Sequence, residues 1–127
     1  MLPFSFEFRS GTPIGPQLVY SVKKAVATGQ LRPGDRFPSV RALSQELRIN
    51  PNTAHKAVVA LTEEGLLDVL PGIGTVVACA RPASHSQRAA LLEDELERLV
   101  VEAKRLELDL DDVLQAVRRQ WKATGGR

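Results

Sequence analysis

The sequence predicts a mostly α-helical protein with one small β-hairpin. Apolar residues recur at helical spacing through the first half of the chain, and again after residue 84. Between these regions, two short strand-like runs flank a Pro/Gly turn at residues 71–74, which is the pattern of a hairpin. Of the 127 residues, 43% are hydrophobic and 25% charged, so the chain can form a packed core and is not expected to be disordered.

The first residues are expected to form an extended lead-in to a helix. Phe4, Phe6 and Phe8 alternate with polar residues, and they should be covered by other parts of the chain because they are most of its aromatic content. A helix is then predicted over about residues 13–28, ended by Gly29. Its apolar positions are Leu18, Val22, Ala25 and Val26. A turn at residues 33–35 leads out of it.

Two helices separated by a short turn come next. Ser39 can cap the first of them. The inward positions of that helix are Val40, Leu43 and Leu47. Asn50 is a good N-cap for the second helix, and Pro51 fits its first position, where no N–H is needed. This second helix should run to about residue 64, with a buried stripe of Ala54, Ala57, Val58 and Leu61. Together the segments predict a helix-turn-helix motif.

The predicted hairpin, residues 66–70 and 75–78, follows directly after the second helix of this motif. A hairpin in that position is a wing, so residues 1–80 are predicted to be a winged helix-turn-helix domain. The glycines at 72 and 74 do not indicate a nucleotide-binding loop, because no long buried strand precedes them and no helix follows.

Residues 50–56, NPNTAHK, place short polar and basic side chains at the start of the second helix. Asparagine can make paired hydrogen bonds to adenine, and threonine and histidine can contact bases or phosphates in a DNA groove. The first N–H groups of the helix can also bind a phosphate. The alternative is an ordinary solvated helix cap, which the neighbouring helix and hairpin make less favourable.

Residues 29–78 resemble the winged helix-turn-helix domain of the GntR family. The resemblance rests on the segment GQLRPGDRFPSVR, on NPNT, on EGLL and on PGIGT, and the upstream TPI and first helix fit as well. NPNT and a short two-helix tail are similar to the YtrA subfamily. The resemblance implies a sequence-specific transcription factor, usually a repressor, that binds double-stranded DNA as a homodimer.

The resemblance also implies which residues contact DNA. Arg41 would hold DNA from the first helix of the motif, and Arg36 and Arg48 are weaker phosphate candidates. The residues expected at the major groove are Asn50, Pro51, Asn52, Thr53, His55 and Lys56. At the wing tip, Gly72, Ile73 and Gly74 would approach the minor groove. Many members of the family carry arginine where His55 stands, so a fixed charge is lost at this position.

Residues 81–127 are expected to form a helical dimerisation region. An apolar stripe runs along a helix over about residues 84–106, and a last helix begins at a possible Asp109–Asp112 capping pair. The residues assigned to a dimer contact are Leu92, Leu96, Leu99, Ala103, Leu106, Leu114, Val117 and Trp121. The region over residues 81–127 is too short to form a ligand-binding domain with a pocket. The alternative is a two-helix flap packed on its own winged helix.

Charge and composition limit which classes of function are compatible with the sequence. Residues 1–82 contain nine Lys/Arg and six Asp/Glu, whereas residues 83–127 contain eight Lys/Arg and nine Asp/Glu. This balance favours the first part of the chain as the place where a polyanion would bind. No catalytic dyad or triad, metal site or cofactor site is expected. One cysteine, Cys79, is expected to be buried, and the absence of a signal peptide or apolar span favours a cytoplasmic protein without membrane contact. The alternative to a DNA-binding regulator is a winged-helix protein-interaction module that does not read a DNA sequence. The sequence does not identify a small-molecule effector.

Overall fold

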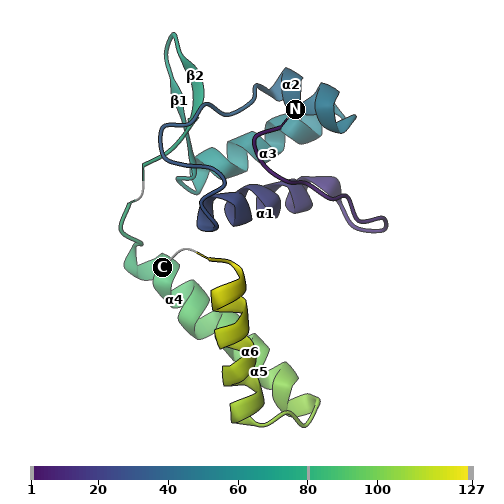
Figure 1. Ribbon diagram of the computed structural model, residues 1–127, viewed down its shortest axis with the longest axis vertical. Helices are drawn as coiled ribbons and strands as arrows, with labels where there is room; N and C mark the ends of the chain where they lie inside the picture. The colour runs from purple at the N-terminus through teal and green to yellow at the C-terminus, as the bar shows by residue number, and fades with distance from the viewer. Residues whose placement is uncertain (1, 80, 126–127) are drawn as a thin grey trace. The chain divides into compact units, whose positions relative to one another are not determined.

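The computed structural model describes residues 2–79 and 81–125. It shows two compact units, an N-terminal one within residues 2–79 and a C-terminal one over Arg81–Thr124 (Figure 1). Helices dominate both units, and a single small antiparallel hairpin lies among the described residues. The predicted fold class is therefore confirmed.

The N-terminal unit has the predicted element order, with boundaries shifted by one or two residues. Its elements are α1 (Ile14–Ala27), α2 (Val40–Leu47), α3 (Pro51–Glu63), β1 (Leu67–Leu70) and β2 (Gly74–Val77). The cap that closes α3 contains Gly65, which has a φ of +81°. There the N–H of Leu66 donates to the carbonyl of Leu61 at 2.9 Å, and the N–H of Gly65 donates to that of Thr62 at 3.0 Å. This is a Schellman cap, whose left-handed position favours glycine.

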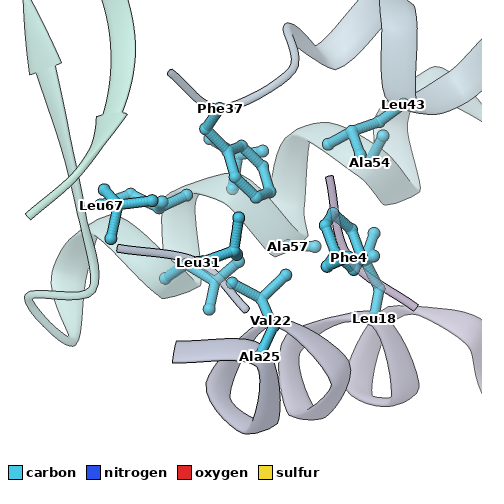
Figure 2. Packing of buried hydrophobic residues seen from close by; sticks show 13 residues of the cluster. Phe4, Leu18, Val22, Ala25, Leu31, Phe37, Leu43, Ala54, Ala57 and Leu67 are labelled. Atoms are coloured by element: carbon cyan, nitrogen blue, oxygen red, sulfur yellow. The ribbon is translucent and has the colours of Figure 1, made fainter. Parts of the chain in front are cut away.

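One aliphatic core joins these elements (Figure 2). The buried side chains on the helices are Leu18, Val22 and Ala25 of α1, Leu43 of α2, and Ala54, Ala57, Val58 and Leu61 of α3. Leu31, Leu67 and Val77 add the loop after α1 and both strands. Each fully buried leucine or valine contributes about 1.5–3 kcal/mol, so this cluster fixes how the helices pack.

The loop before α2 extends the hairpin, which the sequence did not predict. β1 and β2 pair in the register Leu67↔Val77 to Leu70↔Gly74. On the other edge of β2, Arg36 forms a bridge with Val76. Val77 donates to the carbonyl of Asp35 at 2.8 Å, and Phe37 donates to that of Thr75 at 2.8 Å. The expected turn at residues 33–35 is therefore the entry to a third, edge segment that anchors the wing.

The N-terminal lead-in is only partly covered, which corrects the expectation for its three phenylalanines. Phe4 is 4% exposed and stacks on Phe37, with ring centroids 5.7 Å apart. Phe6 is half-buried, and Phe8 is 55% exposed. Near Phe8 the chain is held instead by Gln17, whose Oε1 accepts from the N–H of Arg9 at 2.8 Å. The period-2 pattern predicts an extended chain but not where the chain leaves the core.

The C-terminal unit is a helical hairpin whose first arm is not a regular α-helix. It begins with α4 (His85–Ala89), continues through a π-helical turn over Ala90–Glu95, and becomes α5 (Leu96–Arg105); α6 (Leu110–Ala123) follows. In a π turn the backbone hydrogen bonds span five residues rather than four, so the turn is wider than that of an α-helix. The uniform helical spacing that the sequence predicted for Leu92 and Leu96 is therefore interrupted between them. The expected Asp109–Asp112 capping box is present.

Ion pairs contribute little to this unit. Arg98 pairs with Glu95 at 3.0 Å and Arg105 pairs with Glu102, in each case three residues apart on an exposed surface. The hydrogen bond from Arg105 holds the pKa of the Glu102 carboxyl below its ordinary value. Such exposed pairs are weakened by solvent screening, so they cannot replace a core.

Among the described residues, no helix is both long enough and apolar enough to cross a membrane.

The contrast between Phe4 and Phe8 gives a matched test of the core. Phe4→Ala is expected to lower the free energy of unfolding by about 3–5 kcal/mol, because it leaves a cavity beside Phe37. Phe8→Ala is expected to change it by less than about 0.5 kcal/mol, because that ring is largely in solvent. Urea unfolding followed by circular dichroism measures both. Equal losses would show that the lead-in does not belong to the core as described.

Candidate DNA-binding surface

The helix-turn-helix is built by a well-capped α2 and a tight, left-handed turn. Ser39 Oγ accepts from the N–H of Ala42 at 3.1 Å and so begins α2. At the other end, Arg48 has a φ of 54°. This backbone conformation is unusual for a residue with a side chain and costs about 1 kcal/mol or more. It is held because Ile49 donates to the carbonyl of Ser44 at 3.1 Å, while Ser44 Oγ donates to the carbonyl of Ile49 at 2.8 Å.

The role of Ser44 was not foreseen from the sequence. The only signal is a serine in the last turn of a predicted helix, a position from which its hydroxyl can bond to nearby backbone. The double link between Ser44 and Ile49 sets the direction in which the chain leaves α2. It therefore sets where α3 begins.

Asn50 and Pro51 form the start of α3 as expected. Asn50 Oδ1 accepts from the N–H of Asn52 at 2.8 Å, and the carbonyl of Asn50 accepts from Ala54 at 3.1 Å. Pro51 has no N–H to satisfy. Among the described residues, only the N–H of Thr53 in this first turn is left without an acceptor, so most of the predicted phosphate-binding N–H groups are already used. Because its Oδ1 is held by the cap, the Asn50 side chain is fixed in position, whereas the Asn52 side chain can turn to make the paired contact with adenine.

The next turn of α3 presents the other polar side chains. Asn52, His55 and Lys56 are exposed, on the side of α3 opposite its buried stripe. No hydrogen bond or ion pair of their side chains is found within the described chain, so all three are available to a partner. Thr53 differs: it is half-buried and its Cγ2 lies 3.8 Å from the position that a Cβ at Gly15 would occupy. It therefore faces α1 as much as the surface.

The three candidate arginines come from three different places. Arg41 is exposed in the first turn of α2, Arg48 is exposed in the left-handed turn, and Arg36 is exposed on the edge segment beside β2. Arg36 thus belongs structurally to the wing rather than to the helix-turn-helix. This placement was not predicted because the pairing of Arg36 with Val76 joins residues far apart in sequence.

The wing tip combines a backbone conformation that favours glycine with an apolar surface. Gly72 and Gly74 have φ values of +77° and +110°, which residues with a side chain rarely adopt. Ile73 between them is 53% exposed, and Val69 and Leu70 of β1 are exposed as well. From residue 66 to 79, Asp68 is the only charged residue. The hairpin itself therefore offers apolar side chains and backbone groups, and Arg36, which bridges to Val76, places a positive charge beside β2.

The C-terminal unit carries the second candidate site. Seven of the eight residues assigned to a dimer contact are exposed: Leu92, Leu96, Leu99, Leu106, Leu114, Val117 and Trp121. Ala103 is 6% exposed and so is already buried within one chain. It lies where little room is left for another molecule, which makes it a packing residue rather than a surface contact.

In the part of the chain that the structure describes, neither a metal-ligand cluster nor a buried thiol is found. The described residues contain no group of three or more His, Cys, Asp or Glu side chains that could hold a metal ion. Cys79 is exposed, contrary to the expectation of a buried residue. The reason is that β2 ends at Val77 and Ala78 is the last core residue of this segment.

The fold and this surface define a winged helix-turn-helix protein of the DNA-binding type. The family model for bacterial regulatory proteins, gntR family, matches residues 16–77. The HTH-type transcriptional repressor YtrA of Bacillus subtilis (strain 168) is 33% identical over 104 residues, which are 81% of this chain and 80% of the relative. The chain therefore belongs to the GntR family of DNA-binding transcriptional regulators, is YtrA-like within it, and is not an enzyme.

Solved structures agree with this assignment. A crystal structure of a transcriptional antiterminator from Listeria monocytogenes EGD-e has a TM-score of 0.84 to this chain, covers 98% of it and 93% of its own chain, and is 23% identical. That similarity shows the fold alone. YtrA from Sulfolobus acidocaldarius, a GntR-family transcription factor, has a TM-score of 0.54 at 27% identity and covers 91% and 93% of the two chains.

The two asparagines at the start of α3 can be separated by stability. Asn50→Ala is expected to lower the free energy of unfolding by about 0.5–2 kcal/mol, because the cap of α3 is lost. Asn52→Ala is expected to change it by no more than about 0.5 kcal/mol, because its side chain is exposed and unpaired. Thermal melting of both variants measures the difference. If Asn52→Ala were the more destabilising, Asn52 would have a structural role that the described contacts lack.

Proposed function

We propose that this regulator is a repressor that binds an inverted-repeat operator as a homodimer. The observation that carries the proposal is that one chain has both an exposed polar start of α3 and an apolar helical face in its C-terminal unit. The polar start suits a DNA groove, and the apolar face needs a partner. The name of the Bacillus relative, a transcriptional repressor, supports the direction of regulation.

Roles on DNA are assigned from where each side chain lies. Asn52, His55 and Lys56 would read or approach bases in the major groove, with Asn52 as the residue free to make paired bonds to adenine. Arg41 and Arg48 would hold phosphates beside it. Asn50, Pro51 and the half-buried Thr53 would mainly position the helix.

The wing would contact DNA without much charge of its own. Gly72 and Gly74 allow a tight tip, and Ile73 is a side chain of the kind that proteins insert into a minor groove. Arg36, on the edge of the same sheet, would supply the phosphate contact. This division is unlike a wing that binds mainly through basic residues on the hairpin.

The exposed apolar wing also supports a second function. Val69, Leu70 and Ile73 are exposed together on a hairpin with one charge, and surfaces of this type often bind other proteins. A winged helix that used this patch for a protein partner would not need to read a DNA sequence. The two functions differ in whether the polar start of α3 affects the choice of DNA bases.

Dimerisation is assigned to the C-terminal unit because the apolar face is not covered within it. Leu96 is 43% exposed and Leu99 48%, and the exposed leucines and Trp121 continue over α5 and α6. Burying a leucine contributes about 1.5–3 kcal/mol, and two-fold symmetry uses each contact twice. A symmetric dimer would in turn require two half-sites in the DNA.

Selection of bound fragments from random DNA, followed by mobility-shift titration at several salt concentrations, tests the DNA function. Arg41→Ala is expected to weaken binding to every sequence, because it removes a phosphate contact. Asn52→Ala or His55→Ala is expected to cost about 1–3 kcal/mol at particular base pairs and so to change base preference. If all three variants gave one uniform loss, or if the selection recovered no sequence, the proposed reading of DNA by α3 would be wrong.

A double substitution in α5 tests the dimer. Leu96→Asp with Leu99→Asp is expected to give a folded monomer with little operator affinity, because two linked half-sites bind far more tightly than one. Val101→Asp is the matched control: it is also an exposed apolar residue of α5, but it lies about 140° around the helix from Leu96. Light scattering, circular dichroism and mobility shift measure the outcome.

The alternatives give distinct results. A double variant that remains dimeric would place the dimer contact elsewhere, for example on the lead-in. A monomeric variant that binds DNA normally would remove the C-terminal unit from DNA binding.

A further inference from the structure

A groove of about 420 Å³ lies between α1 and α3 within the N-terminal unit. Val19 and Tyr20 line it from α1, and Ala57 and Ala60 line it from α3. Its volume is in the range that accommodates small ligands in proteins. It adjoins the start of α3, because Thr53 and Lys56 also line it.

The groove is open because small residues line it. Gly15 has no side chain, and Ala57 and Ala60 each have only a methyl group, so neither helix fills the space between them. A Cβ at Gly15 would meet only Thr53 Cγ2, at an ordinary contact distance of 3.8 Å. The backbone of Gly15 therefore does not require glycine, and the space could be occupied without strain. The groove accordingly has room for an apolar group.

The charges around the groove determine what kind of group suits it. At one end, Lys23 Nζ is paired with Glu64 Oε1 at 2.9 Å. Lys56, on the wall near the other end, has no ion pair or side-chain hydrogen bond within the described chain. The hydroxyl groups of Tyr20 and Thr53 likewise have no hydrogen-bond partner among the described residues, and none of the lining residues is acidic. An occupant with an apolar body and a negative charge would complement the apolar walls and pair with Lys56.

We propose that this groove binds a small organic carboxylate with an apolar, aromatic or acyl body, and that binding opposes DNA binding. The second part rests on the proposed function, in which Lys56 approaches DNA. A carboxylate that holds Lys56 withdraws this cation from the DNA, so the ligand and the operator weaken each other's binding to the same extent.

The first experiment locates the site with a defined probe. ¹⁵N-labelled full-length protein is titrated with 2-naphthoate and, separately, with its uncharged counterpart 2-naphthamide, and amide chemical shifts are followed. Naphthoate is expected to shift residues 14–23 and 53–60 and to bind about two- to fivefold more tightly than the amide, because it alone pairs with Lys56. Shifts confined to the exposed leucines of the C-terminal unit, or equal affinity for both probes, would overturn the proposal.

Filling the groove provides the matched variants. Ala60→Leu places a larger side chain in the groove, whereas Val59→Leu introduces the same residue at the adjacent exposed position, which does not line it. Naphthoate binding is expected to weaken at least about tenfold in Ala60→Leu and to stay unchanged in Val59→Leu. Gly15→Leu fills the groove from α1 and serves if Ala60→Leu does not fold. Unchanged binding in a folded groove-filling variant would place the ligand elsewhere.

Mobility shifts on selected DNA test the coupling. Naphthoate is expected to weaken DNA binding by the unmodified protein and by Val59→Leu, but not by Ala60→Leu. If naphthoate maps to the groove while DNA affinity stays constant, the coupling through Lys56 is wrong and the binding site stands. If the protein selects no DNA, the proposed function fails, and the chemical-shift titration still decides whether the groove binds the carboxylate.

Discussion

The structure depends on burying one stripe of α3. Ala54, Ala57, Val58 and Leu61 pack into the core formed with α1, α2 and the strands. Because a helix repeats every 3.6 residues, burying this stripe turns Asn52, His55 and Lys56 to the outside. Ala57 of this stripe and the neighbouring Ala60 also line the groove beside α1, and their small side chains leave it unfilled. The same helix therefore positions both the polar surface and one wall of the groove.

At the start of α3, residues of the same type have different roles, one in the structure of the helix and the other at the surface proposed to bind DNA. Asn50 and Asn52 are both exposed asparagines two residues apart. The side-chain oxygen of Asn50 accepts the helix-cap hydrogen bond, whereas the side chain of Asn52 has no hydrogen bond within the described chain. The strained turn at Arg48 is maintained by Ser44 through local hydrogen bonds. A backbone that is already ordered in the free protein suits a surface that must match a rigid partner, because little ordering is then required on binding.

Apart from the groove, the wing and the C-terminal unit each leave an apolar surface uncovered among the described residues, and the two surfaces differ in kind. The wing exposes a few side chains around Ile73 on a hairpin tied to the core by the edge segment at Arg36. The C-terminal unit exposes most of its leucines and buries little besides Ala103. A two-helix hairpin cannot enclose its own apolar face, so this unit keeps a surface that a partner can cover, whereas the N-terminal unit encloses a core of its own.

Local patterns in the sequence determined the helices, their caps and the hairpin, since these follow from side-chain periodicity and from residues such as Ser39, Asn50, Pro51 and Gly65. They also indicated which face of α3 is polar. Only the tertiary structure decided that Phe8 leaves the core, that Arg36 joins the wing, and that Thr53 turns toward α1. It also revealed the π turn before Leu96 and the groove beside α3. These features arise from contacts between distant residues, or from a change in helical repeat that composition does not encode, so local spacing cannot predict them.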